Sequence, residues 1–451
     1  MREFYEMTAL ELREAIQKRR IGVEELTRAY LKRIDTYDKS CGLNTVAAID
    51  PSVIKEAQRL DNAKADRDLP LFGLSVLIKD NIDVKELFTT AGSVALADNL
   101  AIADAPVVEN LRRAGALILG KTHMTEFANY VSDDMPNGFS SGGGQVVHAY
   151  DPNKDPGGSS TGSGVAMSAG FCSLAVGTDT SFSVVGCAQK HGITGLKPVV
   201  GSVSSQGIVP ICHTLDTAGP MTKTVEDAIL MYSAMRGDGF DPVTAAEPKT
   251  LRLAVNQYQA DTVPVEHQIC ISKMYRNLRE AGVVFSEVNH PSYCEIDDIM
   301  CYEFRHDLEV YLKDSGASMK TLAEIVDFYE ADPSVRMKYG INVLKDGLVK
   351  ASGGMDDPAY LAAMNLRCRQ RAKLERELKE VDAVIATGRT NLMHFAGLPS
   401  IAVPVGMADP RSPVGILMYG LDERRLLSAA LTVEKFCGRI TMPPLEKGKL
   451  L

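Results

Sequence analysis

The segment 155–198 reads D-P-G-G-S-S-T-G-S-G-V-A-M-S-A-G-F-C-S-L-A-V-G-T-D-T-S-F-S-V-V-G-C-A-Q-K-H-G-I-T-G-L-K-P. Two loops rich in glycine and serine flank a short helix of small residues (161–170) and an apolar strand (172–176). Such loops offer serine hydroxyls as nucleophiles and backbone N–H groups as donors to a developing oxyanion. The segment therefore favours covalent acyl-transfer chemistry, if one serine has a base.

The composition indicates a globular protein that binds no polyanion. The chain has 451 residues, of which 45% are hydrophobic and 24% charged, and its formal net charge is -9. This charge opposes binding to nucleic acid, so we expect no nucleic-acid partner and a small, neutral or cationic substrate. The sequence leaves a homodimer open.

The cysteines and the apolar segments indicate a cytoplasmic protein. Nine cysteines are scattered without a C-x-x-C motif, which opposes a disulfide framework or a zinc site. We therefore expect no metal and no cofactor. The first residues carry acids instead of an apolar core, so we expect no signal peptide. No run of 18 apolar residues occurs, so we expect no membrane contact.

The hydrophobic pattern predicts an α/β fold with a central sheet covered by helices on both faces. A capping box at Thr8 and Glu11 opens the first helix, and a later helix is predicted with Asp104 as its cap and Gly115 as its stop. Further strands are predicted at 73–80, 116–119, 251–255, 283–288, 383–386, 401–405 and 415–419. We predict one domain over 1–451, with a core at about 70–235, a helix-rich peripheral segment at about 242–381 and C-terminal strands and a helix at 382–451.

Two other interpretations of the Gly/Ser loops are weaker. The loop 157–164 precedes a helix and could hold a phosphate, but it lacks the lysine of a Walker loop. The stretch around Ser160 matches the G-x-S-x-G elbow of α/β-hydrolases, with Asp382 and His394 as possible partners. Two prolines shortly before Ser160 oppose the strand that such an elbow must follow.

Motifs along most of the chain resemble those of the amidase signature family. In order they are G-L-S-V-L-I-K-D-N-I (73–82), T-T-A-G-S (89–93), G-K-T-H-M-T-E-F-A (120–128), G-G-S-S-T-G-S-G (157–164), G-T-D-T-S-F-S (177–183), H-G-I-T-G-L-K-P (191–198), L-D-T-A-G-P-M-T-K-T-V-E-D-A (215–228) and A-G-L-P-S-I-A-V-P-V-G (396–406). The stretch M-P-N-G-F-S-S-G-G-G-Q (135–145) resembles the peptide-amidase-like branch. The glutaminase component of glutamyl-tRNA amidotransferase is a more distant likeness.

The resemblance implies the family's fold, a mixed sheet between two helical layers, and a Ser–cis-Ser–Lys triad. By motif position, Lys79 is the base, Ser159 the bridging serine after a cis peptide bond, and Ser183 the nucleophile. Lysine acts as a base only when uncharged, so Lys79 should be buried, with Asp80 on the opposite face of its strand. The backbone N–H groups of the loop 180–183 (Thr180, Ser181, Phe182 and Ser183) would hold the oxyanion.

The chain departs from the family pattern near the expected site. Ser181 and Phe182 replace glycines, so Phe182 would be strained if its position requires a positive φ. The polar residue common shortly after the nucleophile is absent from the segment 184–187. Candidate substrate-binding residues are Gln145, Phe182 and Arg389, with Arg305 as a weaker one. The histidines His191, His213 and His394 are predicted to be hydrogen-bonded loop residues instead of catalysts.

Three functions remain in competition. The first is a serine amidohydrolase that acts on a small carboxamide. The second is the glutaminase subunit of a tRNA-dependent amidotransferase, which would need a partner subunit; the altered loop at 181–182 and the peptide-amidase-like stretch oppose it. The third is a homologue that binds but does not catalyse, or catalyses poorly.

Overall fold

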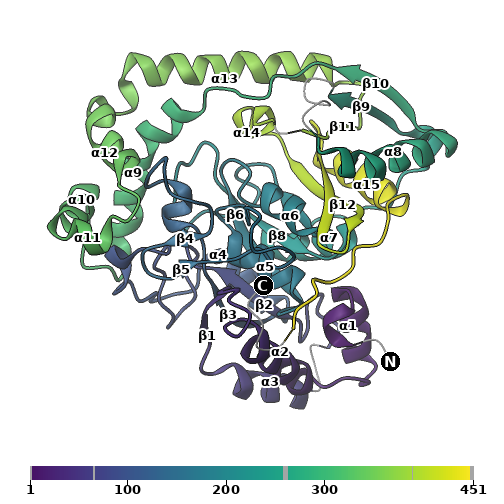
Figure 1. The fold of residues 1–451 in the computed structure, drawn as a ribbon, viewed down its shortest axis with the longest axis horizontal. Coiled ribbons are helices and arrows are strands. Elements are labelled where there is room, and N and C mark those ends of the chain that lie inside the picture. The colour runs from purple at the N-terminus through teal and green to yellow at the C-terminus, as the bar shows by residue number, and fades with distance from the viewer. Residues whose placement is uncertain (1–2, 64–66, 257–262, 389, 447–451) are drawn as a thin grey trace.

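A mixed β-sheet organises the protein in this computed structural model, which describes residues 3–63, 67–256, 263–388 and 390–446 (Figure 1). In this part of the chain eleven strands form one sheet in the order β1-β3-β2-β6-β8-β7-β12-β13-β11-β9-β10, and β4 and β5 form a separate hairpin. The strands are β1 (Val46–Ile49), β2 (Ser75–Lys79), β3 (Leu117–Thr122), β4 (Phe139–Ser140), β5 (Gly144–Gln145), β6 (Leu174–Asp179), β7 (Thr194–Lys197), β8 (Thr217–Thr222), β9 (Arg252–Asn256), β10 (Val284–Val288), β11 (Ala383–Ala386), β12 (Ser400–Asp409) and β13 (Ser412–Tyr419).

The sheet is parallel in two places and antiparallel between them. Strand β2 runs parallel to both β3 and β6, and β9 runs parallel to both β10 and β11. The intervening strands pair antiparallel, and so does β1 at one edge. Strands β2, β6 and β8 are buried along their whole length, as expected for central strands covered on both faces.

Helices cover both faces of the sheet, which confirms the predicted fold class. Helices α5 and α6 pack on each other and on central strands, and α4, α7 and α15 form a second packed group. The helices are α1 (Ala9–Gln17), α2 (Val23–Tyr37), α3 (Val53–Asn62), α4 (Pro106–Arg113), α5 (Thr161–Ser168), α6 (Val185–His191), α7 (Val225–Arg236), α8 (Val265–Glu280), α9 (Asp297–Asp314), α10 (Leu322–Ala331), α11 (Pro333–Arg336), α12 (Asn342–Val349), α13 (Pro358–Glu377), α14 (Leu392–Phe395) and α15 (Glu423–Lys435).

The local signals for helix ends are partly confirmed. The capping box at Thr8 and Glu11 is present, with both reciprocal hydrogen bonds. The prediction of Asp104 as a helix cap is wrong, because Ala105 is the N-cap and Pro106 starts α4. The Asp104 side chain instead accepts from the Lys85 N–H and pairs with Arg112. Proline at the first helical position fits there without a side-chain cap, since it has no N–H to satisfy.

The segment predicted to be peripheral has two structural parts. Strands β9 and β10 extend the edge of the central sheet, beside β11. Helices α9 to α12 lie at the left of Figure 1, and α13 runs from there across the top of the molecule. They enclose a second hydrophobic core, which reaches Phe127 and Phe395 outside the segment and includes Phe304 of α9. The division into core, peripheral segment and C-terminal strands stays a prediction.

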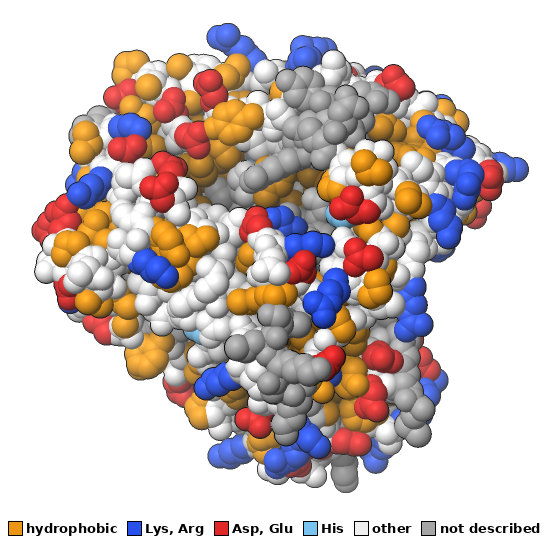
Figure 2. All heavy atoms as spheres, in the orientation of Figure 1, with side chains coloured by type: hydrophobic (Ala, Val, Ile, Leu, Met, Phe, Trp, Pro, Cys, Tyr) orange, Lys and Arg blue, Asp and Glu red, His pale blue; other side chains and the backbone are white. Residues whose placement is uncertain are grey.

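The surface is of mixed character. Basic and acidic side chains are interspersed with hydrophobic ones over the face drawn in Figure 2. Among the described residues, no helix is both long enough and apolar enough to cross a membrane.

Candidate active site

The amine of Lys79 lies at the end of β2, out of contact with water. It donates to the carbonyl oxygen and to Oγ1 of Thr178 at 3.3 and 2.8 Å, and it lies 2.7 Å from Ser159 Oγ. Burial lowers the pKa of Lys79 to about 7. A neutral amine has two N–H bonds and one lone pair, so the two Thr178 contacts leave the lone pair for Ser159.

The neighbouring acid does not pair with Lys79, as the strand alternation predicts. Asp80 makes its ion pair with Lys121, at 3.3 Å, and accepts a hydrogen bond from Thr90. The Asp80 carboxylate, which would favour the protonated form of Lys79 if the two were paired, thus points to the other face of the sheet.

Ser159 connects Lys79 to the second loop. The Gly158–Ser159 peptide bond is cis, as the resemblance implies, and Ser159 Oγ lies 3.1 Å from Ser183 Oγ. Only glycine fits before Ser159, because a Cβ at Gly158 would lie 2.5 Å from Asn137 Oδ1 and 2.6 Å from Thr125 Oγ1. The two Gly/Ser loops therefore meet, although their serines are 24 positions apart in the sequence.

Ser160 has a structural role. Its Oγ donates to the Thr178 carbonyl at 3.0 Å and accepts from the Thr178 N–H at 3.2 Å, so it joins the start of α5 to β6. The partners proposed for an α/β-hydrolase elbow are apart: Asp382 pairs with Arg425, whereas His394 lies against Asp179. The elbow interpretation therefore has no geometric basis.

Hydrogen bonds from three directions hold the loop that carries Ser183. Thr180 Oγ1 donates to Asp216 at 2.6 Å, and Ser183 O accepts from the Ser160 N–H at 3.2 Å. Phe182 N–H donates to His394 Nε2 at 3.0 Å. Of the four predicted oxyanion donors, the Phe182 N–H is therefore already bound to a side chain.

Phe182 has a left-handed backbone, with φ 68°. This is the positive φ that the missing glycine would take freely and that an L side chain adopts at a cost. The ring of Phe182 packs on the ring of His394, with centroids 4.8 Å apart. Glycine at position 186 leaves space for the Phe182 side chain, because a Cβ at Gly186 would lie 3.0 Å from the Phe182 Cβ.

A cavity of about 480 Å³ opens beside Ser183. Besides the loop 180–183, it is lined by residues of mixed character: Ala128, Asn129, Tyr130, Ile211, Ser292, Tyr293, Ile296, Asp297, Met300 and Asn391. Sequence reasoning found only the loop residues. The others come from segments far apart in the chain, and no sequence motif marks the contribution of α9.

The predicted substrate-binding residues differ in whether they line this cavity. Phe182 lines the cavity. Gln145 does not; its amide donates to Asn137 O and Val146 O, which flank the β4–β5 hairpin. Arg305 pairs with Glu309 on α9. Arg389 lies outside the described residues.

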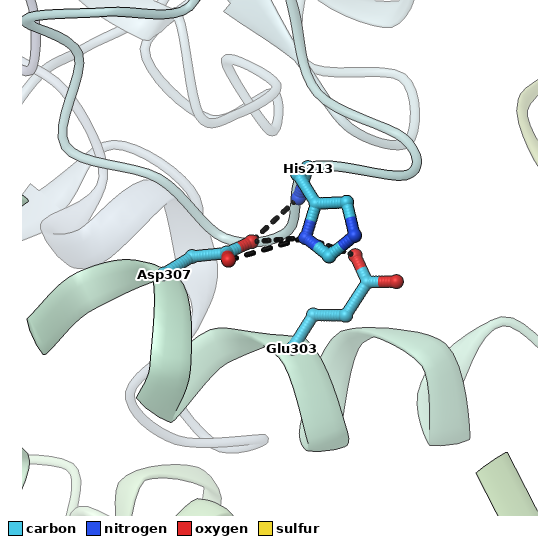
Figure 3. Close-up of side chains that lie close together, drawn as sticks. All are labelled: His213, Glu303 and Asp307. Atoms are coloured by element: carbon cyan, nitrogen blue, oxygen red, sulfur yellow. Dashed lines mark hydrogen bonds and ion pairs between the residues drawn. The ribbon is translucent and has the colours of Figure 1, made fainter. Parts of the chain in front are cut away.

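A set of potential metal ligands lies where the turn 213–215, just before β8, meets α9. His213, Glu303 and Asp307 place their ligand atoms within 4.8 Å of one another, and Figure 3 shows the His213 ring between the two carboxylates. Glu303 accepts from Thr214 and Tyr360, and Asp307 accepts from the His213 backbone and ring. Through these hydrogen bonds the cluster connects the loop that carries His213 and Thr214 to α9.

Comparison with known proteins now identifies the family. A model of the amidase family matches residues 25–388. The chain belongs to the amidase family. It is 32% identical to a mandelamide hydrolase of Pseudomonas putida, covering 97% of this chain and 93% of that protein. It is 28% identical to a component of the glutamyl-tRNA(Gln) amidotransferase of Alkaliphilus metalliredigens, covering 98% and 99%.

The structural likeness leads to the same family. Native peptide amidase from Stenotrophomonas maltophilia superposes with a TM-score of 0.88 and 31% identity, covering 98% of this chain and 99% of that one. The fold is thus the amidase signature fold, and the protein is an amidase, a hydrolase that acts on the C–N bonds of amides.

We expect Phe182→Gly to change the substrate preference of this amidase more than its stability. Glycine removes the cost of the left-handed backbone, about 1 kcal/mol, while the lost ring contacts act in the opposite direction. The cavity becomes larger, so kcat/KM should shift toward amides with bulkier acyl groups. The shift is measured on a series of amides of rising acyl size, together with the Tm.

Phe182→Ala is the matched control for this experiment. It removes the same ring but keeps a Cβ at φ 68°, so it should share the altered preference and be the less stable of the two. An unchanged ratio of kcat/KM values across the series would show that Phe182 does not shape the site.

Proposed function

We propose that this amidase is a serine amidohydrolase that cleaves a small carboxamide through an acyl-enzyme on Ser183. Ser159 relays the proton and Lys79 is the base. The proposal depends on one observation: Lys79 Nζ, Ser159 Oγ and Ser183 Oγ form a continuous chain at 2.7 and 3.1 Å, buried at the mouth of a cavity.

The reaction follows from this chain of groups. Ser183 Oγ forms a bond to the amide carbon while its proton passes to Ser159, and the Ser159 proton passes to Lys79. The relay then runs backward, so that the leaving nitrogen takes a proton as the C–N bond breaks. Water hydrolyses the resulting ester along the same path. Preorganised N–H donors stabilise the oxyanion, and one such donor contributes about 3 kcal/mol.

The cavity favours neutral or cationic amides. Ile296, Met300 and Tyr130 supply apolar and aromatic walls, and Asp297 is the one charged side chain among its described lining residues. A carboxylate at the rim repels an anionic substrate and attracts a cationic one. Mandelamide and peptide amides, named for two of the relatives, are therefore suitable first substrates, and we expect hydrolysis in the cytoplasm without a partner subunit.

An active-site probe tests the nucleophile. A fluorophosphonate should modify Ser183, which mass spectrometry of the digested protein locates, and Ser183→Ala and Ser159→Ala should abolish the labelling. Ser160→Ala is the matched control: labelling should persist, while the free energy of unfolding falls by about 1–3 kcal/mol, because the Thr178 carbonyl and N–H lose a buried partner. Modification of Ser160 or Ser181 in place of Ser183 would contradict the proposal.

The pH dependence tests the base. Lys79 accepts a proton only in its neutral form, so kcat/KM should rise with pH up to about 7, the lowered pKa, and stay level above it. The negative charge of Asp216 raises the pKa of Lys79, so Asp216→Asn should move the rising limb to lower pH. A rate that continues to rise beyond about pH 9, nearer the ordinary pKa of a lysine, would show that Lys79 is not the base.

A further inference from the structure

The His394 ring lies close to two groups of the segment that precedes Ser183, the Phe182 N–H and the Asp179 carboxylate. Its Nε2 is 3.0 Å from Phe182 N and 3.0 Å from Asp179 Oδ1. His394 and Asp179 are fully buried, and Phe182 is half-buried. His394 comes from α14, more than 200 positions after the loop, so the contact depends on the tertiary fold.

One imidazole nitrogen cannot serve both groups at once. Without a proton, Nε2 accepts from the Phe182 N–H; with a proton, it donates to Asp179. Burial raises the pKa of Asp179, but the charge and hydrogen bond of protonated His394, the charge of Lys197 and the N–H of Val184 outweigh burial and lower that pKa below its ordinary value. His394 therefore binds the Phe182 N–H in one protonation state and the Asp179 carboxylate in the other.

Asp179 is itself tied to the helix that follows the nucleophile. Its Oδ2 accepts from the N–H groups of Val184 and Val185 at 2.8 and 3.0 Å. Lys197 of β7 is a further cation that acts on Asp179, and Lys197 in turn is acted on by Glu423, Arg367 and Arg371. Asp179 also acts on the buried Lys79. Asp179 and His394 together thus hold the backbone on both sides of Ser183.

We propose that His394 is a positioning residue that anchors the loop 180–183 through the Phe182 N–H. This inference rests on the proposed function. Within the described part of the chain, the N–H groups of Thr180, Ser181 and Ser183 donate to no protein acceptor, so of the four predicted donors these three are left for the oxyanion. His394 touches no reacting atom and acts through Phe182.

The left-handed residue needs such an anchor. A glycine at position 182 would take φ 68° without help, whereas phenylalanine adopts it at a cost in backbone energy. His394 offsets this cost twice, with a hydrogen bond to the N–H and a ring contact to the side chain. The same two contacts fix where Ser183 Oγ points, because Ser183 is the next residue.

The experiment compares two substitutions of similar shape, His394→Met and His394→Gln. Methionine fills the space but forms neither hydrogen bond, whereas the glutamine amide offers an oxygen to Phe182 and an NH₂ to Asp179 at the same time. We expect kcat to fall at least about tenfold in His394→Met with KM nearly unchanged, since a misplaced oxyanion loop costs transition-state binding. His394→Gln should restore kcat to within about threefold of the parent.

A control substitution separates positioning from general stability. His290 is also buried, and its ring contacts Tyr419 and Glu377 away from the loop. His290→Gln should lower the Tm without changing kcat or KM. A second readout needs no substitution: in the parent protein, hydrogen exchange at the Phe182 N–H should be slower than at Ser181 and Ser183.

Each outcome bears on the inference. Equal kcat in His394→Met and the parent, equal losses in His394→Met and His394→Gln, or fast exchange at the Phe182 N–H would overturn it. If His394→Met does not fold, the exchange rates and His394→Gln still decide. Failure of the fluorophosphonate to label Ser183 in the parent would instead overturn the proposed function.

Discussion

The removal of the Lys79 amine from water is the constraint on which the rest of the site depends. A buried ammonium without a carboxylate is costly, so burial favours the neutral amine. The fold achieves this by placing Lys79 at the end of a strand buried on both faces and by pairing the adjacent Asp80 with Lys121. The central position of β2, between β3 and β6, is therefore a chemical requirement as well as a topological one.

The sequence predicted the parts of the site that lie on local patterns. Strand alternation separated Lys79 from Asp80, and the motif spacing brought Ser159 to Ser183. It did not predict β8, whose Gly219 and Pro220 are residues that oppose a central strand. Packing explains this strand: a Cβ at Gly219 would lie 2.0 Å from Leu196 O, so the close approach of β7 requires glycine.

The walls of the cavity and the partner of Phe182 could not be predicted for a different reason. Ile296 and Met300 are ordinary apolar positions in and next to α9, and His394 is one of several histidines in loops or short helices. Each acquires its role only when segments far apart in the chain pack together. Such contacts leave no periodic signal in a single sequence, because only local geometry imposes a period.

The turn at Asp216 links the peripheral helices to the site by a path of hydrogen bonds. Glu303 and Asp307 of α9 accept hydrogen bonds from His213 and Thr214, and Asp216 accepts one from Thr180 of the loop 180–183. Removal from water raises the pKa of Asp216 to about 7, so its charge changes over the same range as that of Lys79. Deprotonation of Asp216 raises the pKa of Lys79 and strengthens the Thr180 contact. Ionised Asp216 therefore orders the loop 180–183 and at the same time disfavours the neutral amine of Lys79.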